Sequence, residues 1–312
     1  MKVLITPRGF ANYGLDEVKL MESKGLEVDY NDTGKAYSAE QFLQKAKDAD
    51  AIIVGVDDMS EPVMKQLPKL KVVCKFGVGV DNIDCDYAKE HGIYVGRTVG
   101  SNSLSVAEHV AALMFADAKN LYPTIRDVKA GSWVKRTGIE LSGKTLGIIG
   151  FGAIGKRLSR IASGIGMSVL AYDTFPIKEE DARDYGAKIA GFEEIIEDSD
   201  YVSVHVPLLD STRNMISTEQ FKSMKSSACV LNAARGGVVD EDALYHALTD
   251  GEIRSAAFDV FTTEPPAKDN PLLGLDNFLL TSHTASRTHE AEKRTCQIST
   301  DVILTQLGLK DY

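Results

Sequence analysis

The chain has 312 residues, of which 44% are hydrophobic and 26% are charged, and this composition is typical of a folded globular protein. The length predicts two domains, each large enough to bury its own core. The formal net charge of -10 disfavours a basic groove, so we expect neither nucleic acid nor an anionic membrane as a partner. The four cysteines lack C-x-x-C spacing and are expected to be free thiols, with no bound metal.

Short apolar runs alternate with helical patterns from the N-terminus onward, as in parallel sheets that carry helices on both faces. The first run reads as a strand rather than a secretory signal, and no run reaches the roughly 18 apolar residues of a membrane span. We therefore expect a cytoplasmic protein. In the first hundred residues, strands are predicted at Val3–Thr6, Ala51–Gly55, Val72–Phe76 and Ile93–Val95, and helices at Glu17–Ser23 and Ala39–Ala46.

A long helix is predicted after the polar residues Ser101, Asn102 and Ser103, which can cap it, and it leads into a second domain. The strands expected there are Thr145–Ile149, Ser168–Tyr172, Tyr201–Val206, Cys229–Asn232, Ala256–Val260 and Phe278–Leu280. The last stretch has a helical pattern and is expected to pack back on the first domain. The predicted fold is two doubly wound, Rossmann-like parallel-sheet domains with a cleft between them, at residues 1–100 plus 286–312 and residues 101–285.

Residues 150–155 read Gly-Phe-Gly-Ala-Ile-Gly, a G-x-G-x-x-G sequence between a predicted strand and a predicted helix. Gly150 allows a tight turn, Gly152 lets the backbone approach a pyrophosphate, and Gly155 lets helix and strand pack closely. Asp173 ends the next strand, where its carboxylate can bind ribose hydroxyls and repel a 2'-phosphate. This arrangement predicts NAD rather than NADP as the cofactor; the alternative is a turn with incidental glycines.

Three later strands end in segments that carry polar side chains, the position where parallel sheets bind ligands. Reduction of a 2-keto acid requires a cation for the carboxylate and a proton donor for the carbonyl oxygen. Arg235 can bind a carboxylate through its planar fork, and His283 can act as the acid and base, with Glu264 tuning it. Each residue taken alone also fits a solvated turn, a surface-loop carboxylate or a structural histidine.

The order of these motifs resembles a known family. They are G-x-G-x-x-G, His205-Val206-Pro207, Asn232-x-x-Arg235-Gly236, Asp259-Val260-Phe261-x-x-Glu264-Pro265 and the strand-end His283. Over nearly the whole chain this order resembles the D-isomer-specific 2-hydroxyacid dehydrogenases, especially the phosphoglycerate-dehydrogenase-like branch. The segments Gly77–Asp84 and Asn102–His109 also look like segments of that family.

The resemblance implies that Arg235, Glu264 and His283 form the catalytic trio of an NAD-dependent enzyme acting on a small 2-hydroxy or 2-keto acid. It implies D stereochemistry, a flavodoxin-like substrate domain and a homodimer formed through the helix after Ser101. Asp259 would meet the nicotinamide amide, and Val78 and Gly79 would bind the substrate together with Arg235. The cofactor-binding residues it implies are Gly150, Gly152, Ala153, Ile154, Gly155, Asp173, His205, Val206, Pro207, Thr212, Ala233, Asp259 and Ala285.

Some positions depart from the family pattern. Val56–Met59 stands where phosphoglycerate dehydrogenases often carry Arg-Ser-x-Thr, and its two carboxylates would repel a substrate phosphate. Ser282 and Ala285 replace the usual Pro and Gly around His283. A formate-dehydrogenase-like activity is disfavoured, because those relatives place Gln where Glu264 stands. An NAD(H)-sensing, corepressor-like binding protein remains an alternative, since such relatives can keep the same trio.

Overall fold

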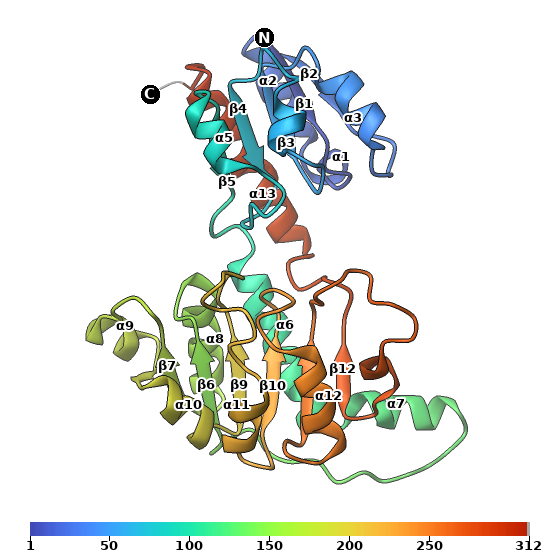
Figure 1. Cartoon of the computed structure of the whole chain (residues 1–312), viewed down its shortest axis with the longest axis vertical. Coiled ribbons are helices and arrows are strands. Elements are labelled where there is room, and N and C mark those ends of the chain that lie inside the picture. The colour runs from blue at the N-terminus through green and yellow to red at the C-terminus, as the bar shows by residue number, and fades with distance from the viewer. Residues whose placement is uncertain (311–312) are drawn as a thin grey trace. The chain divides into compact units, whose positions relative to one another are not determined.

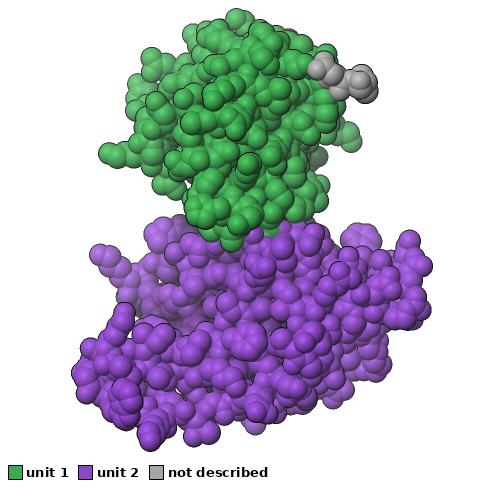
Figure 2. All heavy atoms as spheres, turned by 180° about the vertical axis from the view of Figure 1, so that it is seen from behind, with its two compact units in different colours: residues 1–102, 287–312 green, residues 103–286 purple. Residues whose placement is uncertain are grey.

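A computed structural model of the chain describes residues 1–310. The chain divides into two compact units, coloured separately in Figure 2: Met1–Asn102 with the segment that begins at Arg287, and Ser103–Ser286. Each unit contains its own sheet. The C-terminal segment was expected to continue through Asp311 and Tyr312, which lie outside the described residues.

Unit 1 is built on a five-stranded parallel sheet in the order β2-β1-β3-β4-β5, which is the flavodoxin-like strand order. Its strands are β1 (Lys2–Ile5), β2 (Glu27–Tyr30), β3 (Ala51–Val54), β4 (Val72–Lys75) and β5 (Tyr94–Arg97). Its helices are α1 (Phe10–Tyr13), α2 (Leu15–Ser23), α3 (Ala39–Ala46), α4 (Glu61–Met64), α5 (Cys85–Glu90) and α13 (His289–Gln306). All of β3 is buried, as expected for a central strand covered on both faces.

Unit 2 is built on a seven-stranded parallel sheet in the order β12-β11-β10-β9-β6-β7-β8. Its strands are β6 (Thr145–Ile149), β7 (Ser168–Tyr172), β8 (Lys188–Ile189), β9 (Tyr201–Val204), β10 (Cys229–Asn232), β11 (Ser255–Phe258) and β12 (Phe278–Leu280). The strand order reverses between β6 and β9, where a doubly wound sheet binds its ligand. The prediction of two doubly wound parallel-sheet domains is confirmed.

The helices of unit 2 cover both faces of its sheet (Figure 1). They are α6 (Ser103–Ala118), α7 (Leu121–Lys129), α8 (Ala153–Gly164), α9 (Glu179–Asp184), α10 (Phe192–Asp198), α11 (Thr218–Ser223), α12 (Glu241–Thr249) and a 3-10 turn at Pro271–Gly274. Two apolar clusters result, because strand side chains alternate between faces: Tyr201 packs into one cluster, and Val202 and Val204 into the other. Among the described residues, no helix is long and apolar enough to cross a membrane.

The two helices that open unit 2 differ in burial. Nine residues of α6 are buried, whereas α7 has none. Tyr122, Ile125 and Val128 of α7 are exposed, and Trp133 in the irregular segment that follows is 80% exposed. In Figure 1 this segment forms a long connection between α7 and β6. Exposed apolar side chains of this region therefore lie mainly on α7 and the chain after it, while α6 contributes Leu104 and Phe115.

Candidate active site

The glycine loop connects β6 to α8 at the switch point of the unit 2 sheet. Gly150 has φ +100°, and a Cβ there would lie 2.6 Å from the carbonyl oxygen of His205. A Cβ on Gly155 would lie 2.3 Å from the carbonyl oxygen of Gly150, so the close approach of α8 to β6 requires glycine. At Gly152, by contrast, nothing lies within 4 Å of the Cβ position, which leaves open space at the first turn of α8.

Asp173 follows β7 and holds the neighbouring turns. Its Oδ2 accepts a hydrogen bond from the backbone N–H of Phe151 at 2.8 Å, and its Oδ1 accepts one from Phe175 N–H at 3.0 Å. The carboxylate thus stands beside the glycine loop. Open space over Gly152, the N-terminus of α8 and a carboxylate after the next strand fit a dinucleotide.

His205, which follows β9, is a second polar group beside the glycine loop. Its Nε2 lies 2.9 Å from Ser203 Oγ, while its Nδ1 is buried without a hydrogen-bond partner among the described residues. Burial lowers the pKa of His205 to about 4, so the ring is neutral at pH 7. Thr212 stabilises the loop after β9, because its hydroxyl donates to Pro207 O at 2.6 Å and accepts from Leu209 N–H at 2.8 Å.

Glu264 and His283 meet beside a cavity of about 610 Å³ in unit 2. His283 Nδ1 lies 2.7 Å from Glu264 Oε2, and the other carboxylate oxygen accepts a hydrogen bond from Phe261 N–H at 3.0 Å. The His283 side chain is half exposed, so a ligand in the cavity can reach it. The residues that line this cavity are Asp259, Phe261, Glu264, Pro265, Pro266, Leu280, Thr281, Ser282 and His283.

The buried Asp259, 1% exposed, organises the segment that carries His283. Its carboxylate accepts hydrogen bonds from Thr281 Oγ1 at 2.5 Å, Thr284 N–H at 2.9 Å and Ala285 N–H at 2.8 Å. Its carbonyl oxygen accepts from His283 N–H at 2.8 Å. Both oxygens of a residue predicted to meet the nicotinamide amide are therefore engaged within the protein.

Arg235 lies in the turn after β10, at the same edge of the sheet as the pair. Its Nη1 donates to Ala234 O at 2.7 Å, and it does not line the cavity described above. The buried Asn232 shapes this turn, because its side chain donates to Arg235 O and accepts from Ala234 N–H. Ala233 is half buried in the same turn. The structure thus brings Glu264 and His283 together and leaves the role of Arg235 a prediction.

The predicted substrate residues Val78 and Gly79 lie in unit 1, in the loop after β4. Val78 is exposed, and Gly77 before it has φ +152°. Lys75 ends β4, and its Nζ donates to Gly55 O at 2.6 Å and to Asn82 Oδ1 at 2.5 Å. Sequence reasoning did not single out this lysine, which occupies the strand end that precedes the glycine-containing loop.

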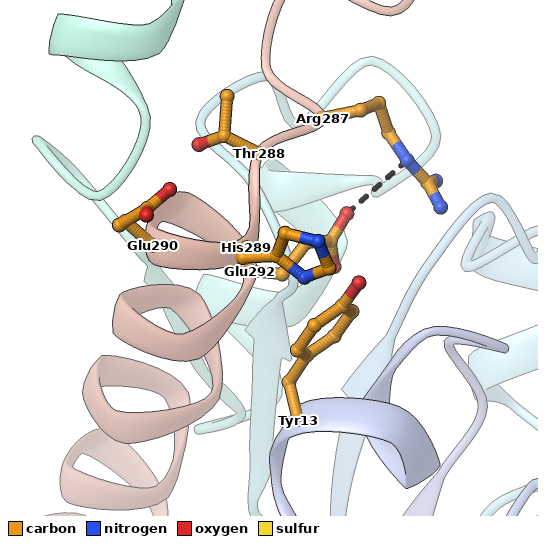
Figure 3. Close-up of a pocket in the computed structure, with 6 residues that line it drawn as sticks. All are labelled: Tyr13, Arg287, Thr288, His289, Glu290 and Glu292. Atoms are coloured by element: carbon orange, nitrogen blue, oxygen red, sulfur yellow. Dashed lines mark ion pairs between the residues drawn. The ribbon is translucent and has the colours of Figure 1, made fainter.

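A second cavity, of about 500 Å³, lies within unit 1 at the start of α13 (Figure 3). Glu292 is 8% exposed, and its Oε1 lies 3.2 Å from Arg287 Nε. Burial raises the pKa of Glu292, while Arg287 opposes that shift. Tyr13 and His289 face one another edge to face. None of the predicted site residues lines this cavity, so the chemistry of the candidate site belongs to the Glu264–His283 cavity.

Comparison with known proteins gives one family. Residues 111–285 match the D-isomer specific 2-hydroxyacid dehydrogenase family in its NAD binding domain. The chain is 43% identical over 282 residues to a D-3-phosphoglycerate dehydrogenase of Methanocaldococcus jannaschii, covering 89% of this chain but 53% of that protein. It is 37% identical over 301 residues to a glyoxylate reductase of Korarchaeum cryptofilum, covering 94% of this chain and 90% of the relative.

A solved structure agrees over the full length of the fold. The crystal structure of D-lactate dehydrogenase from Aquifex aeolicus, complexed with NAD and lactic acid, has a TM-score of 0.81 and 30% identity and covers 99% of this chain and 96% of its own. This chain spans about half the length of the phosphoglycerate dehydrogenase and nearly all of the other two proteins. The chain belongs to the D-isomer specific 2-hydroxyacid dehydrogenases, a family of NAD-dependent oxidoreductases.

Proposed function

We propose that this protein is an NAD-dependent D-2-hydroxyacid dehydrogenase that interconverts a 2-keto acid and the corresponding 2-hydroxy acid. The observation that carries the proposal is the 2.7 Å contact between His283 Nδ1 and Glu264 Oε2 beside a cavity in the domain that matches the family. A histidine oriented by a carboxylate is a suitable general acid and base near neutral pH.

The positions of the protons on His283 define the roles of His283 and Glu264. Glu264 accepts from Nδ1–H of His283, so Nε2 is the nitrogen that exchanges a proton with substrate. In reduction, protonated His283 gives the Nε2 proton to the carbonyl oxygen; in oxidation, the neutral ring takes the proton from the hydroxyl. Phe261 N–H holds the second oxygen of Glu264 and fixes the direction of its carboxylate.

The bound dinucleotide supplies and accepts the hydride. The residues that fit it are the amides of Gly152, Ala153 and Ile154 at the start of α8, with Asp173 beside the glycine loop. The charge of Asp173 disfavours a 2'-phosphate, which supports NAD over NADP. The unpartnered Nδ1 of His205 offers a further polar contact at this edge.

Arg235 of unit 2 is the group proposed to bind the substrate carboxylate. Arginine binds a carboxylate through two parallel hydrogen bonds, which also orient C2 of the acid. Support for an acid without a phosphate comes from the loop after β3. The Asp57 carboxylate accepts a hydrogen bond from Thr6 Oγ1, and Asp58 accepts two from Ser60, so two negative charges are fixed there.

The decisive experiment follows NADH oxidation with glyoxylate, pyruvate, hydroxypyruvate, longer 2-keto acids and 3-phosphohydroxypyruvate, for the wild type and for His283→Gln. We expect turnover of at least one unphosphorylated acid and a loss of kcat of about 10³-fold in the variant. NADH affinity should stay unchanged, because His283 belongs to the acid-base machinery. Tight NADH binding without turnover of any acid would contradict the proposal and favour an NAD(H)-sensing protein.

We further propose that the protein is a homodimer, formed through the helix after Ser101, which is α6, together with α7 and the segment after it. Most apolar residues of α6 are buried, whereas Leu104 and Phe115 are exposed. Exposed apolar side chains on α7 lie beside charges of both signs, Arg126, Asp127 and Lys129, and such a patch can pair with itself across a two-fold axis. Light scattering measures the mass, and a monomer at micromolar concentration would contradict this interface.

A further inference from the structure

A second histidine in unit 2 contacts the group that holds the catalytic segment. His109 lies on α6, and its Nε2 is 3.0 Å from Thr281 Oγ1 and 3.7 Å from Asp259 Oδ1. Its side chain is 22% exposed. His109 lies 172 residues from Thr281 in sequence, so the contact depends on the packing of α6 against the end of β12.

The direction of these hydrogen bonds follows from the number of protons. The hydroxyl of Thr281 has one proton, and it donates that proton to Asp259 Oδ1 at 2.5 Å. Toward His109 the hydroxyl can therefore only accept, so the Nε2 of His109 carries a proton. The chain of donors runs from His109 through Thr281 to the Asp259 carboxylate.

Asp259 depends on these hydrogen-bond donors. Within the part of the chain that the structure describes, no lysine or arginine forms an ion pair with it, although it is 1% exposed. Its charge is instead stabilised by the Thr281 hydroxyl and by the backbone N–H groups of Thr284 and Ala285. A buried charge held by hydrogen bonds loses stabilisation when one donor is removed.

The same carboxylate fixes an unfavourable backbone conformation at the catalytic histidine. His283 has φ +54°, in the left-handed region that residues other than glycine rarely adopt. Such a conformation persists only where neighbouring contacts define it. Here those contacts are the bonds of Asp259 to the two residues after His283 and to His283 N–H itself.

We infer that His109 is a positioning residue for the reaction: by donating through Thr281 to Asp259, it holds the 281–285 segment so that the His283 ring faces Glu264. The inference rests on the proposed function. His109 does not line the cavity and is not assigned contact with substrate or dinucleotide. Its effect is expected on the geometry of the acid-base pair rather than on binding.

The kinetic test compares variants that remove or keep the donor. His109→Phe keeps a ring of similar size without Nε2–H, and we expect kcat to fall about tenfold while KM for the acid changes less than twofold. His109→Gln places an amide N–H near the same position and should recover at least half of the lost activity. His246→Phe on α12, an exposed histidine outside this network, is the matched control and should equal the wild type.

A double-mutant cycle with Thr281→Val tests the proposed path. Each single variant should lose about tenfold in kcat, and the double variant should lose about tenfold rather than a hundredfold, because both substitutions break one chain of hydrogen bonds. Multiplicative losses, or an unchanged kcat in His109→Phe, would overturn the inference. Should His109→Phe fail to fold, Thr281→Val and His109→Gln give the same comparison.

A second readout does not depend on turnover. In ¹⁵N-histidine spectra, His109 should show the Nε2–H form. The Nδ1–H resonance of His283, which the hydrogen bond to Glu264 shifts downfield, should move upfield in His109→Phe and in Thr281→Val because that contact lengthens. A resonance that stays at the wild-type position in both variants overturns the inference. If the wild type turns over none of the acids, the proposed function fails while this resonance still reports whether His109 positions His283.

Discussion

Two aspartates with little-exposed carboxylates, at opposite edges of the unit 2 sheet, are held in different ways. Asp117, at the amino edge, pairs with Arg254 through two hydrogen bonds, Nη1 to Oδ1 at 2.9 Å and Nη2 to Oδ2 at 2.8 Å. The Asp117 carboxylate also accepts hydrogen bonds from Tyr201 OH at 2.7 Å and from Ser255 Oγ at 2.6 Å. Asp259, at the carboxyl edge, is held by backbone amides, a hydroxyl and, through it, a histidine.

The two aspartates therefore serve different purposes in one sheet: Asp117 stabilises the fold, and Asp259 positions a functional segment. An arginine neutralises Asp117 and fixes its geometry, and this network joins the end of α6 to the first residues of β9 and β11. Asp259 uses its hydrogen bonds to define the conformation of a segment that carries a reactive side chain. Parallel sheets place ligands at the carboxyl edge, so we expect substitutions there to change catalysis and substitutions at the amino edge to change stability.

The largest expected effect is at the amino edge. Asp117→Asn leaves the Arg254 guanidinium without its charged partner, and we expect the free energy of unfolding to fall by about 3–5 kcal/mol, measured by urea denaturation. The kcat of the folded fraction should not change. Asp276→Asn, which breaks the exposed pair with Arg126, is the control and should leave unfolding unchanged. A loss of kcat in folded Asp117→Asn would contradict the claim that the amino-edge network acts on stability alone.

The next effect concerns His205 at the carboxyl edge, whose buried Nδ1 has no hydrogen-bond partner among the described residues. Burial lowers the pKa of His205 from its ordinary 6.5 to about 4, so between these values the unfolded chain binds more protons. The stability contributed by neutral His205 is fully present above pH 6.5 and is lost as the pH falls toward 4, a change of about 3 kcal/mol at most.

His205→Gln lacks this titration, and its free energy of unfolding should therefore decline less than that of the wild type between pH 7.5 and pH 4.5. The exposed His246→Gln serves as control and should follow the wild type. Parallel pH profiles for wild type and His205→Gln would show that the neutral His205 ring is not the source of the acid sensitivity.

The smallest expected effect is on cofactor preference and concerns a third carboxylate, that of Asp173. The Asp173 carboxylate, like that of Asp259, accepts hydrogen bonds from backbone amides, and among the described residues no lysine or arginine forms an ion pair with it, so its negative charge is not neutralised. Asp173→Ala should reduce the preference for NADH over NADPH, measured as the ratio of kcat/KM values, by about tenfold. Asp173→Asn keeps an acceptor without the charge and should relax the preference as well. An unchanged ratio in both variants would sink the assignment.

Apolar runs in the sequence predicted most of the strands of the fold. The strands at 145–149, 168–172, 229–232 and 278–280 have the predicted bounds. β2 and β8 were missed because they lack the continuous apolar run that marks a strand buried on both faces. α7 was not predicted as a separate helix, and none of its apolar residues is buried.

The sequence by itself determined the glycine loop, the strand-end carboxylate at Asp173 and the identity of Glu264 and His283 as candidates, because these depend on local backbone requirements and on spacing along the chain. Only the tertiary structure decided that Glu264 and His283 touch, that Asp259 holds the segment that carries His283, and that His109 and Arg254 complete the two aspartate networks. The physical reason is that a hydrogen bond depends on distances of a few tenths of an ångström between side chains far apart in sequence, and only the packing of helices on the sheet sets those distances.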